Sequence, residues 1–210
     1  ILHQIGMVHQ EFSRYDVALD YYSQSLAIKR EIGNREGEAG TLHQIGIVYQ
    51  ETHRYDRALD CYTQSLAIER ELGNRTYEAT TLHHIGMVYQ ATHRYDEALD
   101  CYTRSLVIRR ELGDREVEAG ALHQIGTVYQ AAHQYDEALD YYTRGLTIKR
   151  EIGNRGDEAR ALHQIGIVYQ TVHQYDEALN YYNQALAIER ELGDQEGEAR
   201  TLHQIGMVYE

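Results

Sequence analysis

Histidines and carboxylates are the residues in this sequence whose types could do chemistry. The chain carries 12 His and 33 Asp plus Glu residues. Imidazole is a zinc ligand and a general acid or base near neutral pH, and paired carboxylates serve acid–base catalysis. The spacing of these residues decides whether either chemistry is available.

The histidine spacing argues against a metal site. The sequence has no H-E-x-x-H and no C-x-x-C segment. His43 and His83 stand 40 residues apart, in the same slot of neighbouring repeats, too distant to share a zinc ion with Zn–N distances of about 2.0–2.1 Å. His83 and His84 are adjacent, but successive helical side chains project about 100° apart. We predict no metal and no cofactor.

The carboxylates argue against catalysis in a similar way. Asp56, Glu71 and Glu78 lie where helix ends are expected, not as a sheltered pair with a perturbed proton. The sequence also lacks the phosphate-binding segment G-x-x-x-x-G-K-[ST] and the nucleophile segment G-x-S-x-G. We therefore predict that the chain is not an enzyme.

A 40-residue repeat explains why the same residue types keep returning. The segment LHQIGIVYQ at 42–50 recurs with small changes at 2–10, 82–90, 122–130, 162–170 and 202–210. Such a period indicates a stacked array of one structural unit. We predict a single solenoid over 1–210, with units 1–33, 34–73, 74–113, 114–153, 154–193 and 194–210.

Each unit is expected to be a pair of helices. Leu42, Ile45 and Val48 form one apolar stripe of a first helix, helix A, at roughly 35–51. A second helical period from Ala58 predicts helix B at roughly 55–72. Gly73 can close helix B in the left-handed conformation, and the short connections make the two helices antiparallel.

The residues that begin the helices follow the same pattern. Asn74 is a preferred N-cap for the next helix A, and Asp56 places negative charge at the start of helix B. Gly46 sits in the middle of helix A, where glycine costs about 1 kcal/mol relative to alanine. We expect it to make room for the ring of Tyr62 on helix B.

Leu-x-x-Ile-Gly-x-x-Tyr followed by Ala-x-x-x-Tyr resembles the tetratricopeptide repeat along essentially the whole chain. Gly46, Tyr49 and Ala58 match that pattern, whereas Arg70 stands in its proline slot and the unit is longer. This longer form resembles the arrays of kinesin light chains and of bacterial multidomain signalling proteins. The resemblance implies an all-α, right-handed superhelix of antiparallel helix pairs, with five units plus an extra helix A.

Composition limits the location and the partners. The net charge of −13 argues against nucleic acid, and no apolar run approaches the 18 residues of a membrane span. Cys61 and Cys101 are expected to be free thiols, which suits a reducing, cytoplasmic location. The chain opens at Ile1 within the repeated segment without a signal peptide, so we expect it to be part of a longer protein.

A peptide-binding groove is the predicted functional site. His43, Ile47 and Gln50 lie at i, i+4 and i+7, on one face of helix A away from the core stripe. The resemblance implies that helix A lines a concave groove, and that the chain is a protein–protein interaction scaffold, the recognition arm of a larger signalling protein. The groove residues carried over are His43, Ile47, Gln50 and Glu51; His83, Met87, Gln90 and Ala91; His123, Thr127, Gln130 and Ala131; and His163, Ile167, Gln170 and Thr171.

Repeated His and Gln side chains could hold the backbone of an extended peptide, while varied positions read its side chains. Histidine titrates near 6.5, so we expect acidic peptides to bind more tightly at pH 6 than at pH 8. The alternative is that this face is solvated surface inherited by duplication. The varied positions are 47, 87, 127 and 167 together with Gly40, Thr80, Gly120 and Arg160.

A structural rival is a rod or filament that assembles head to tail. Repeat arrays normally end in a unit with a polar outer face, and this chain shows none at either end. The apolar residues expected to lack cover are Leu202, Ile205, Val208 and Tyr209 at one end, and Tyr15, Tyr22 and Leu26 at the other.

Overall fold

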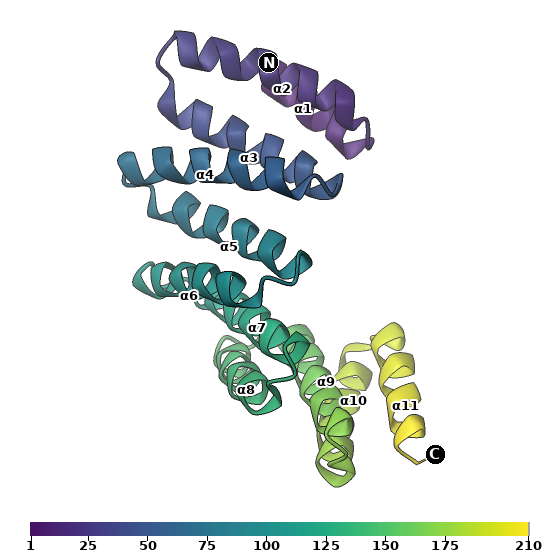
Figure 1. Ribbon diagram of the computed structural model, residues 1–210. Helices are drawn as coiled ribbons and strands as arrows, with labels where there is room; N and C mark the ends of the chain where they lie inside the picture. Colours follow the sequence, from purple (N-terminus) through teal and green to yellow (C-terminus); the bar gives the residue numbers. More distant parts are fainter. Residues whose placement is uncertain (210) are drawn as a thin grey trace. The chain divides into compact units, whose positions relative to one another are not determined.

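The computed structural model describes residues 1–209, which are helical apart from short connections and contain no strand (Figure 1). The helices of this described part are α1 (Leu2–Glu11), α2 (Tyr15–Glu31), α3 (Arg35–Glu51), α4 (Tyr55–Glu71), α5 (Arg75–Ala91), α6 (Tyr95–Glu111), α7 (Arg115–Ala131), α8 (Tyr135–Glu151), α9 (Arg155–Thr171), α10 (Tyr175–Leu192) and α11 (Gln195–Val208). Odd-numbered helices are the predicted helices A and even-numbered ones the predicted helices B. The predicted bounds 35–51 and 55–72 agree with α3 and α4 to within one residue.

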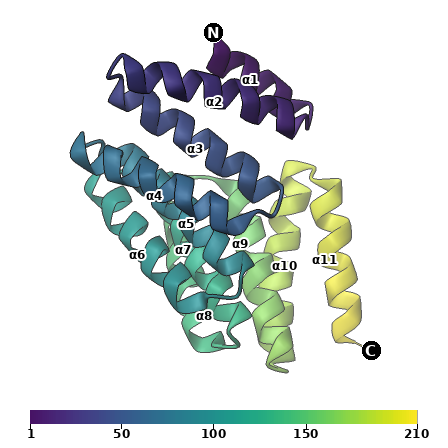
Figure 2. The same cartoon turned by 45° about the horizontal axis from the view of Figure 1, so that its top comes forward.

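The chain divides into two compact parts, Ile1–Ile108 and the part from Arg109 on. We call these two parts the first and the second unit, and we call the 40-residue elements repeats. Within each unit, helices A and B pair as antiparallel neighbours. Ser65 Oγ of α4 donates to the Ala39 carbonyl near the start of α3, at 2.8 Å. Tyr62 OH of the same helix donates to Gln50 Oε1 near the end of α3, also at 2.8 Å. Figure 2 shows the pairing of α9 with α10 in the second unit, with α11 beside α10.

The predicted helix ends are present. The N-cap side chain of Asn34 accepts from the Gly37 amide at 2.8 Å, and Asn74, Asp114, Asn154 and Asp194 cap α5, α7, α9 and α11 in the same way. Gly73 has a φ of 68°, the left-handed conformation expected after helix B. Asp56 lies in the first turn of α4, so its charge meets the positive end of the helix dipole.

The connection from helix A to helix B holds a feature that the sequence did not indicate. His53 has a φ of 57°, and its equivalents Ser13, His93, His133 and His173 share this left-handed conformation. Only a few per cent of residues other than glycine adopt it, although Asn, Asp and His do so more often than the rest. In the histidine copies the ring compensates in part, because Nδ1 lies 2.8 Å from the Tyr55 hydroxyl in the first of them.

Gly46 is needed for the reason predicted. A Cβ atom on Gly46 would lie 2.6 Å from Cε1 of the Tyr62 ring, closer than van der Waals contact allows. The ring is fully buried and packs with Leu82, Ile85 and Val88 of α5. The same approach recurs between Gly6 and Tyr22, Gly86 and Tyr102, Gly126 and Tyr142, and Gly166 and Tyr182.

Arg70, in the slot where the tetratricopeptide pattern has proline, links successive repeats. Its Nε lies 2.8 Å from Oε1 of Glu78 on α5, and Arg75 Nη1 lies 2.6 Å from the other oxygen of that carboxylate. Glu78 is buried. Burial alone would raise the pKa of this carboxyl, but the hydrogen bonds from Arg70 and Arg75 outweigh it and lower the pKa. The arginine therefore joins helix B to the following helix A.

Two further expectations can be compared with the structure. Cys61 and Cys101 are free thiols, as predicted. The expectation that Tyr22 lacks cover is wrong, because α1 packs against it and its ring is fully buried. Tyr15 and Leu26 are half-buried, whereas Val8 and Phe12 of the first repeat are exposed.

Candidate functional site

The glutamines of the predicted groove are fixed by the buried tyrosines. Tyr62 OH donates to Gln50 Oε1, and the same bond forms in the other repeats at 2.6–3.0 Å. The carbonyl side of the carboxamide is thereby directed into the repeat, which leaves its NH₂ side to face away. The pairs are Tyr22 with Gln10, Tyr62 with Gln50, Tyr102 with Gln90, Tyr142 with Gln130, and Tyr182 with Gln170.

The histidines connect one helix A to the next. The His43 ring lies against the Tyr62 ring, with centroids 5.3 Å apart. Its Nδ1 lies 3.0 Å from Thr81 Oγ1 on α5. His163 on α9 reaches Thr201 on α11 in the same way, at 2.9 Å, and only 6% of its surface is exposed. These rings are therefore part of the packing between repeats.

This placement changes the expected titration of the histidines. Burial lowers the pKa of His43 to about 4, with a further contribution from His84. Burial also lowers the pKa of His163 to about 4, aided by the charge of Arg200. The expectation that these residues gain charge just below pH 6.5 is wrong, because the burial of their rings opposes protonation. Tighter binding of acidic peptides at pH 6 than at pH 8 no longer follows.

The varied residue of each helix A is partly exposed. In the first unit these are Ile47 and Met87, and in the second Thr127 and Ile167. The structure does not bring all twelve predicted residues to the surface alike: the glutamines and the varied residues are half-buried, and so are His43, His83 and His123, whereas His163 is buried.

A groove follows these positions between α1 and α3, with a volume of about 370 Å³. Met7 and Gln10 occupy the slots of Ile47 and Gln50, and Gln44 comes from α3. Glu51 accepts a hydrogen bond from Gln10 Nε2 at 3.1 Å. The remaining lining residues are Glu11, Ser13 and Tyr15. We refer to this surface as the helix A groove; its lining includes two carboxylates and no basic residue.

Sequence reasoning missed the residue that follows each histidine. Gln164 Nε2 donates to Gln130 Oε1 at 2.8 Å, which links α9 to α7. In the first unit, His84 fills this slot and its ring stacks on Tyr62 with centroids 5.6 Å apart. The available signal was the recurrence of a polar residue here in Gln44, His84, Gln124 and Gln164, one position away from the predicted face.

The histidine pairs do not form a ligand set. The rings of His43 and His84 are 4.8 Å apart between centroids, in an edge-to-face arrangement. Within residues 1–209, no three His, Cys, Asp or Glu side chains are grouped so that they could hold a metal ion. None of the helices in this part of the chain is both long and apolar enough to cross a membrane.

Stacked antiparallel helix pairs with a 40-residue period define a helical repeat protein. The family model of the tetratricopeptide repeat matches residues 1–71, 77–151 and 157–210. The chain therefore belongs to the tetratricopeptide repeat family, a class of repeat scaffold that presents extended surfaces for interaction.

Solved structures share this fold at low sequence identity. BtubC (BKLC) from P. vanneervenii is 18% identical, with a TM-score of 0.83 over 91% of this chain and 80% of that one. A putative kinesin light chain from Podosopora anserina with nearly identical TPR-like repeats is 20% identical, with a TM-score of 0.78 over 91% and 94%. The prediction of a kinesin light chain-like array is confirmed.

A third structure is a signal transduction ATPase with numerous domains from Pyrococcus horikoshii, which has a tetratricopeptide repeat sensor. It is 15% identical, with a TM-score of 0.80 over 99% of this chain and 32% of that one. No curated protein matches the chain in sequence.

Proposed function

We propose that the chain is a protein-interaction scaffold that binds an extended peptide along helices A, in the helix A groove and its equivalents. The observation that carries this proposal is the bond from each buried tyrosine to a helix A glutamine. It holds the carboxamides of these five glutamines in one orientation within each unit, so their NH₂ groups are ordered without further loss of side-chain entropy; that of Gln10 also donates to Glu51 Oε2. Peptide carbonyls are the matching acceptors.

The residues Ile47, Met87, Thr127 and Ile167 would select the side chains of the peptide, because this position changes between repeats while the glutamine three residues later stays the same. The histidines support this face from behind by joining consecutive helices. Because Glu11 and Glu51 line the groove without a basic residue, we propose that the preferred peptide carries positive charge. The repeat sensor of the P. horikoshii protein makes a recognition arm in a larger signalling protein a reasonable role.

A peptide display screen followed by substitution tests this proposal. The variant Ile47→Ala/Met87→Ala should weaken a selected peptide by about tenfold or more, as loss of central apolar contacts does in other interfaces. Thr103→Ala is the matched control, since Thr103 is exposed on α6, a helix B. Binders that are indifferent to the changes at 47 and 87 would refute binding along helices A.

Head-to-tail association is a second candidate, favoured by exposed apolar side chains. Leu202, Met207 and Tyr209 are exposed at α11, and Val8 and Phe12 are exposed in the first repeat. Joining these two surfaces would give an open, heterologous assembly. Light scattering over about a hundredfold range of concentration should show mass growth that Leu202→Glu abolishes; a monomer throughout would exclude this candidate.

A further inference from the structure

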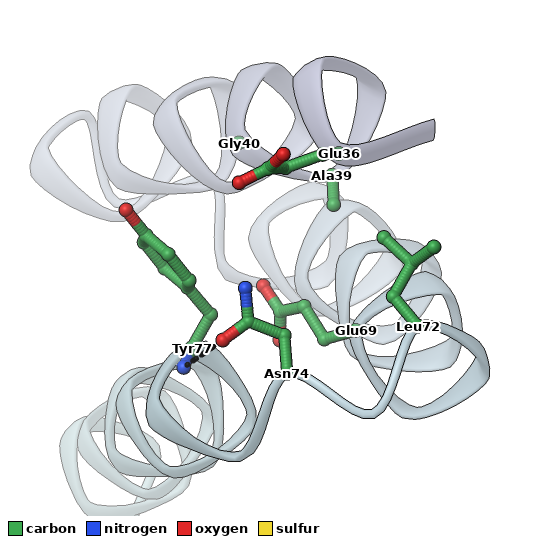
Figure 3. Close-up of a pocket in the computed structure, with 7 residues that line it drawn as sticks. All are labelled: Glu36, Ala39, Gly40, Glu69, Leu72, Asn74 and Tyr77. Atoms are coloured by element: carbon green, nitrogen blue, oxygen red, sulfur yellow. Dashed lines mark hydrogen bonds between the residues drawn. The ribbon is translucent and has the colours of Figure 1, made fainter. Parts of the chain in front are cut away.

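A small cavity lies at the opposite end of helix A from the glutamine row, where α3, α4 and α5 meet. Its volume is about 90 Å³, and its lining residues are Glu36, Ala39, Gly40, Glu69, Leu72, Asn74 and Tyr77 (Figure 3). A cavity of about 150 Å³ holds benzene, and water occupies about 30 Å³ in the liquid. This cavity, which we call the Glu69 pocket, therefore suits a group of a few heavy atoms.

The carboxylate of Glu69 has one satisfied and one unsatisfied oxygen. Oε1 accepts a hydrogen bond from Thr81 Oγ1 at 2.9 Å, and it also lies 2.9 Å from Ser65 Oγ, whose single proton is shared with the Ala39 carbonyl. Oε2 is buried and has no hydrogen-bond partner, although the residue is only 3% exposed. A buried carboxylate oxygen without a partner costs free energy that a bound donor would recover. Burial raises the pKa of this carboxyl, against the opposing hydrogen bonds from Ser65 and Thr81.

The surroundings of Glu69 favour a cation with a short apolar body. In Figure 3 the side chains of Glu69 and Asn74 point into the pocket, the Tyr77 ring lies along one side and Leu72 along the other. The carboxylate of Glu36 adds a second negative charge at the rim. No Cβ contact limits the space at Gly40, where a side chain would meet nothing within 4 Å.

Two other repeats carry a lysine in the slot of Glu69. The equivalents of Glu69 and Tyr77 in the second unit are Lys149 and Asp157. There the Lys149 Nζ lies 3.0 Å from Asp157 Oδ2, with 11% of the lysine side chain exposed. In the first repeat, Lys29 takes the slot of Glu69 and donates to Thr41 Oγ1. In both repeats the ammonium belongs to the protein itself and replaces the glutamate, whereas the lining of the Glu69 pocket holds two carboxylates and no basic residue.

The oxygen without a partner, Oε2 of Glu69, favours an ammonium over a guanidinium as the bound cation. A guanidinium binds a carboxylate through two parallel hydrogen bonds, one to each oxygen, and the hydroxyl groups of Ser65 and Thr81 already lie 2.9 Å from Oε1 of Glu69. An ammonium is a compact point donor that needs only one oxygen of each acceptor. We propose that the Glu69 pocket is a binding site for a primary alkylammonium group, from a free amine or from a lysine side chain of another protein. This site is separate from the helix A groove.

Titration with n-propylammonium chloride tests the site directly. We expect saturable shifts of the Gly40, Asn74 and Tyr77 amides in ¹H–¹⁵N spectra, with a dissociation constant in the millimolar range. Glu69→Gln should weaken binding by about tenfold or more, because a charged hydrogen bond is lost. Asp60→Asn removes the same charge from an exposed position of α4 and should change binding by less than about twofold.

Glu69→Lys is the second variant, and it should fold because Lys29 and Lys149 occupy this slot in other repeats. It should abolish binding. Equal affinity in the wild type and either Glu69 variant, or no localised shifts at all, would overturn the proposal. So would n-propylguanidinium binding at least as tightly as the amine.

A last experiment distinguishes a free amine from a lysine side chain of another protein as the ligand. Nα-acetyl-lysine methylamide that binds as tightly as n-propylammonium would assign the pocket to a lysine of a partner protein. Binding of n-propylammonium alone would assign it to a free amine. Both results support an alkylammonium site.

Discussion

The ring of Tyr142 lies where a side chain on Gly126 would have to stand: a Cβ atom there would be 2.7 Å from the ring carbon Cδ1. Tyr142 is almost fully buried and bonded to Gln130, so it has little freedom to move aside. Gly120 on the same helix has nothing within 4 Å of an added Cβ. The two glycines of α7 therefore differ in function although both lie inside the helix.

The first prediction follows from this contrast. Gly126→Ala should destabilise the protein by about 1–3 kcal/mol through overpacking. Gly120→Ala should stabilise it by about 0.5–1 kcal/mol, because alanine favours the helix and clashes with nothing. Urea unfolding of both variants measures this, and changes of the same sign in the two variants would contradict it.

The second prediction concerns acid stability. The folded pKa of His163 is about 4 because the ring is buried, whereas the unfolded value is about 6.5. Unfolding therefore takes up a proton between these values, and stability is lost as the pH falls from about 6.5 to about 4. His163→Gln should reduce this loss by about 1–3 kcal/mol.

Unfolding curves between about pH 5 and 7 measure the difference. His203→Gln is the control, because it removes an imidazole from an exposed position on α11. Burial raises the pKa of Glu189, which acts in the opposite direction, so the comparison between variants is the informative quantity. An unchanged slope in His163→Gln would be inconsistent with a neutral buried ring.

The sequence predicted the features that depend on neighbours along the chain. The period, the helix bounds, the N-cap at Asn74 and the left-handed Gly73 all follow from local spacing and residue type. The role of Gly46 was also predictable, because Tyr62 lies on the paired helix at a fixed distance along the sequence. Each of these rests on contacts within one repeat.

Most features that the sequence could not predict arise from contacts between repeats. His43 loses its ordinary titration because Thr81 and His84 of the next helix A cover it. The pairing of Arg70 with Glu78 crosses the turn between repeats, and spacing alone does not reveal which carboxylate an arginine reaches. The left-handed backbone at His53 lies within a repeat and was not predicted either, because histidine adopts this conformation more often than most residues but still only in a minority of cases.

The third prediction concerns the cost of the left-handed backbone conformation. It is tested at His93, the equivalent of His53, where φ is 58°. His93→Gly and His93→Ala both lose the contact with the Tyr95 hydroxyl, so their difference reports the backbone alone. Glycine should be more stable than alanine here by about 1 kcal/mol. At exposed Thr103 within α6 the order should reverse by about 1 kcal/mol. Thermal unfolding of the four variants checks this, and alanine matching glycine at position 93 would argue against the left-handed conformation.

The last prediction concerns the arginine in the proline slot. Arg150 Nε lies 2.8 Å from Oε1 of Glu158, a buried carboxylate that also pairs with Arg155. Burial would raise the pKa of Glu158, but the two arginines outweigh it and lower the pKa, so the group is ionised at neutral pH.

Removing one arginine leaves this buried charge half-paired, and Arg150→Ala should therefore cost about 1–3 kcal/mol. Arg144 on the same helix pairs with exposed Asp140 at 3.1 Å, and Arg144→Ala should cost at most about 1 kcal/mol. The double variant Arg150→Ala/Glu158→Gln should recover part of the loss, because the uncompensated charge is gone. Urea unfolding at neutral pH measures all three, and equal costs for the two arginines would show that Arg150 acts only as a surface charge.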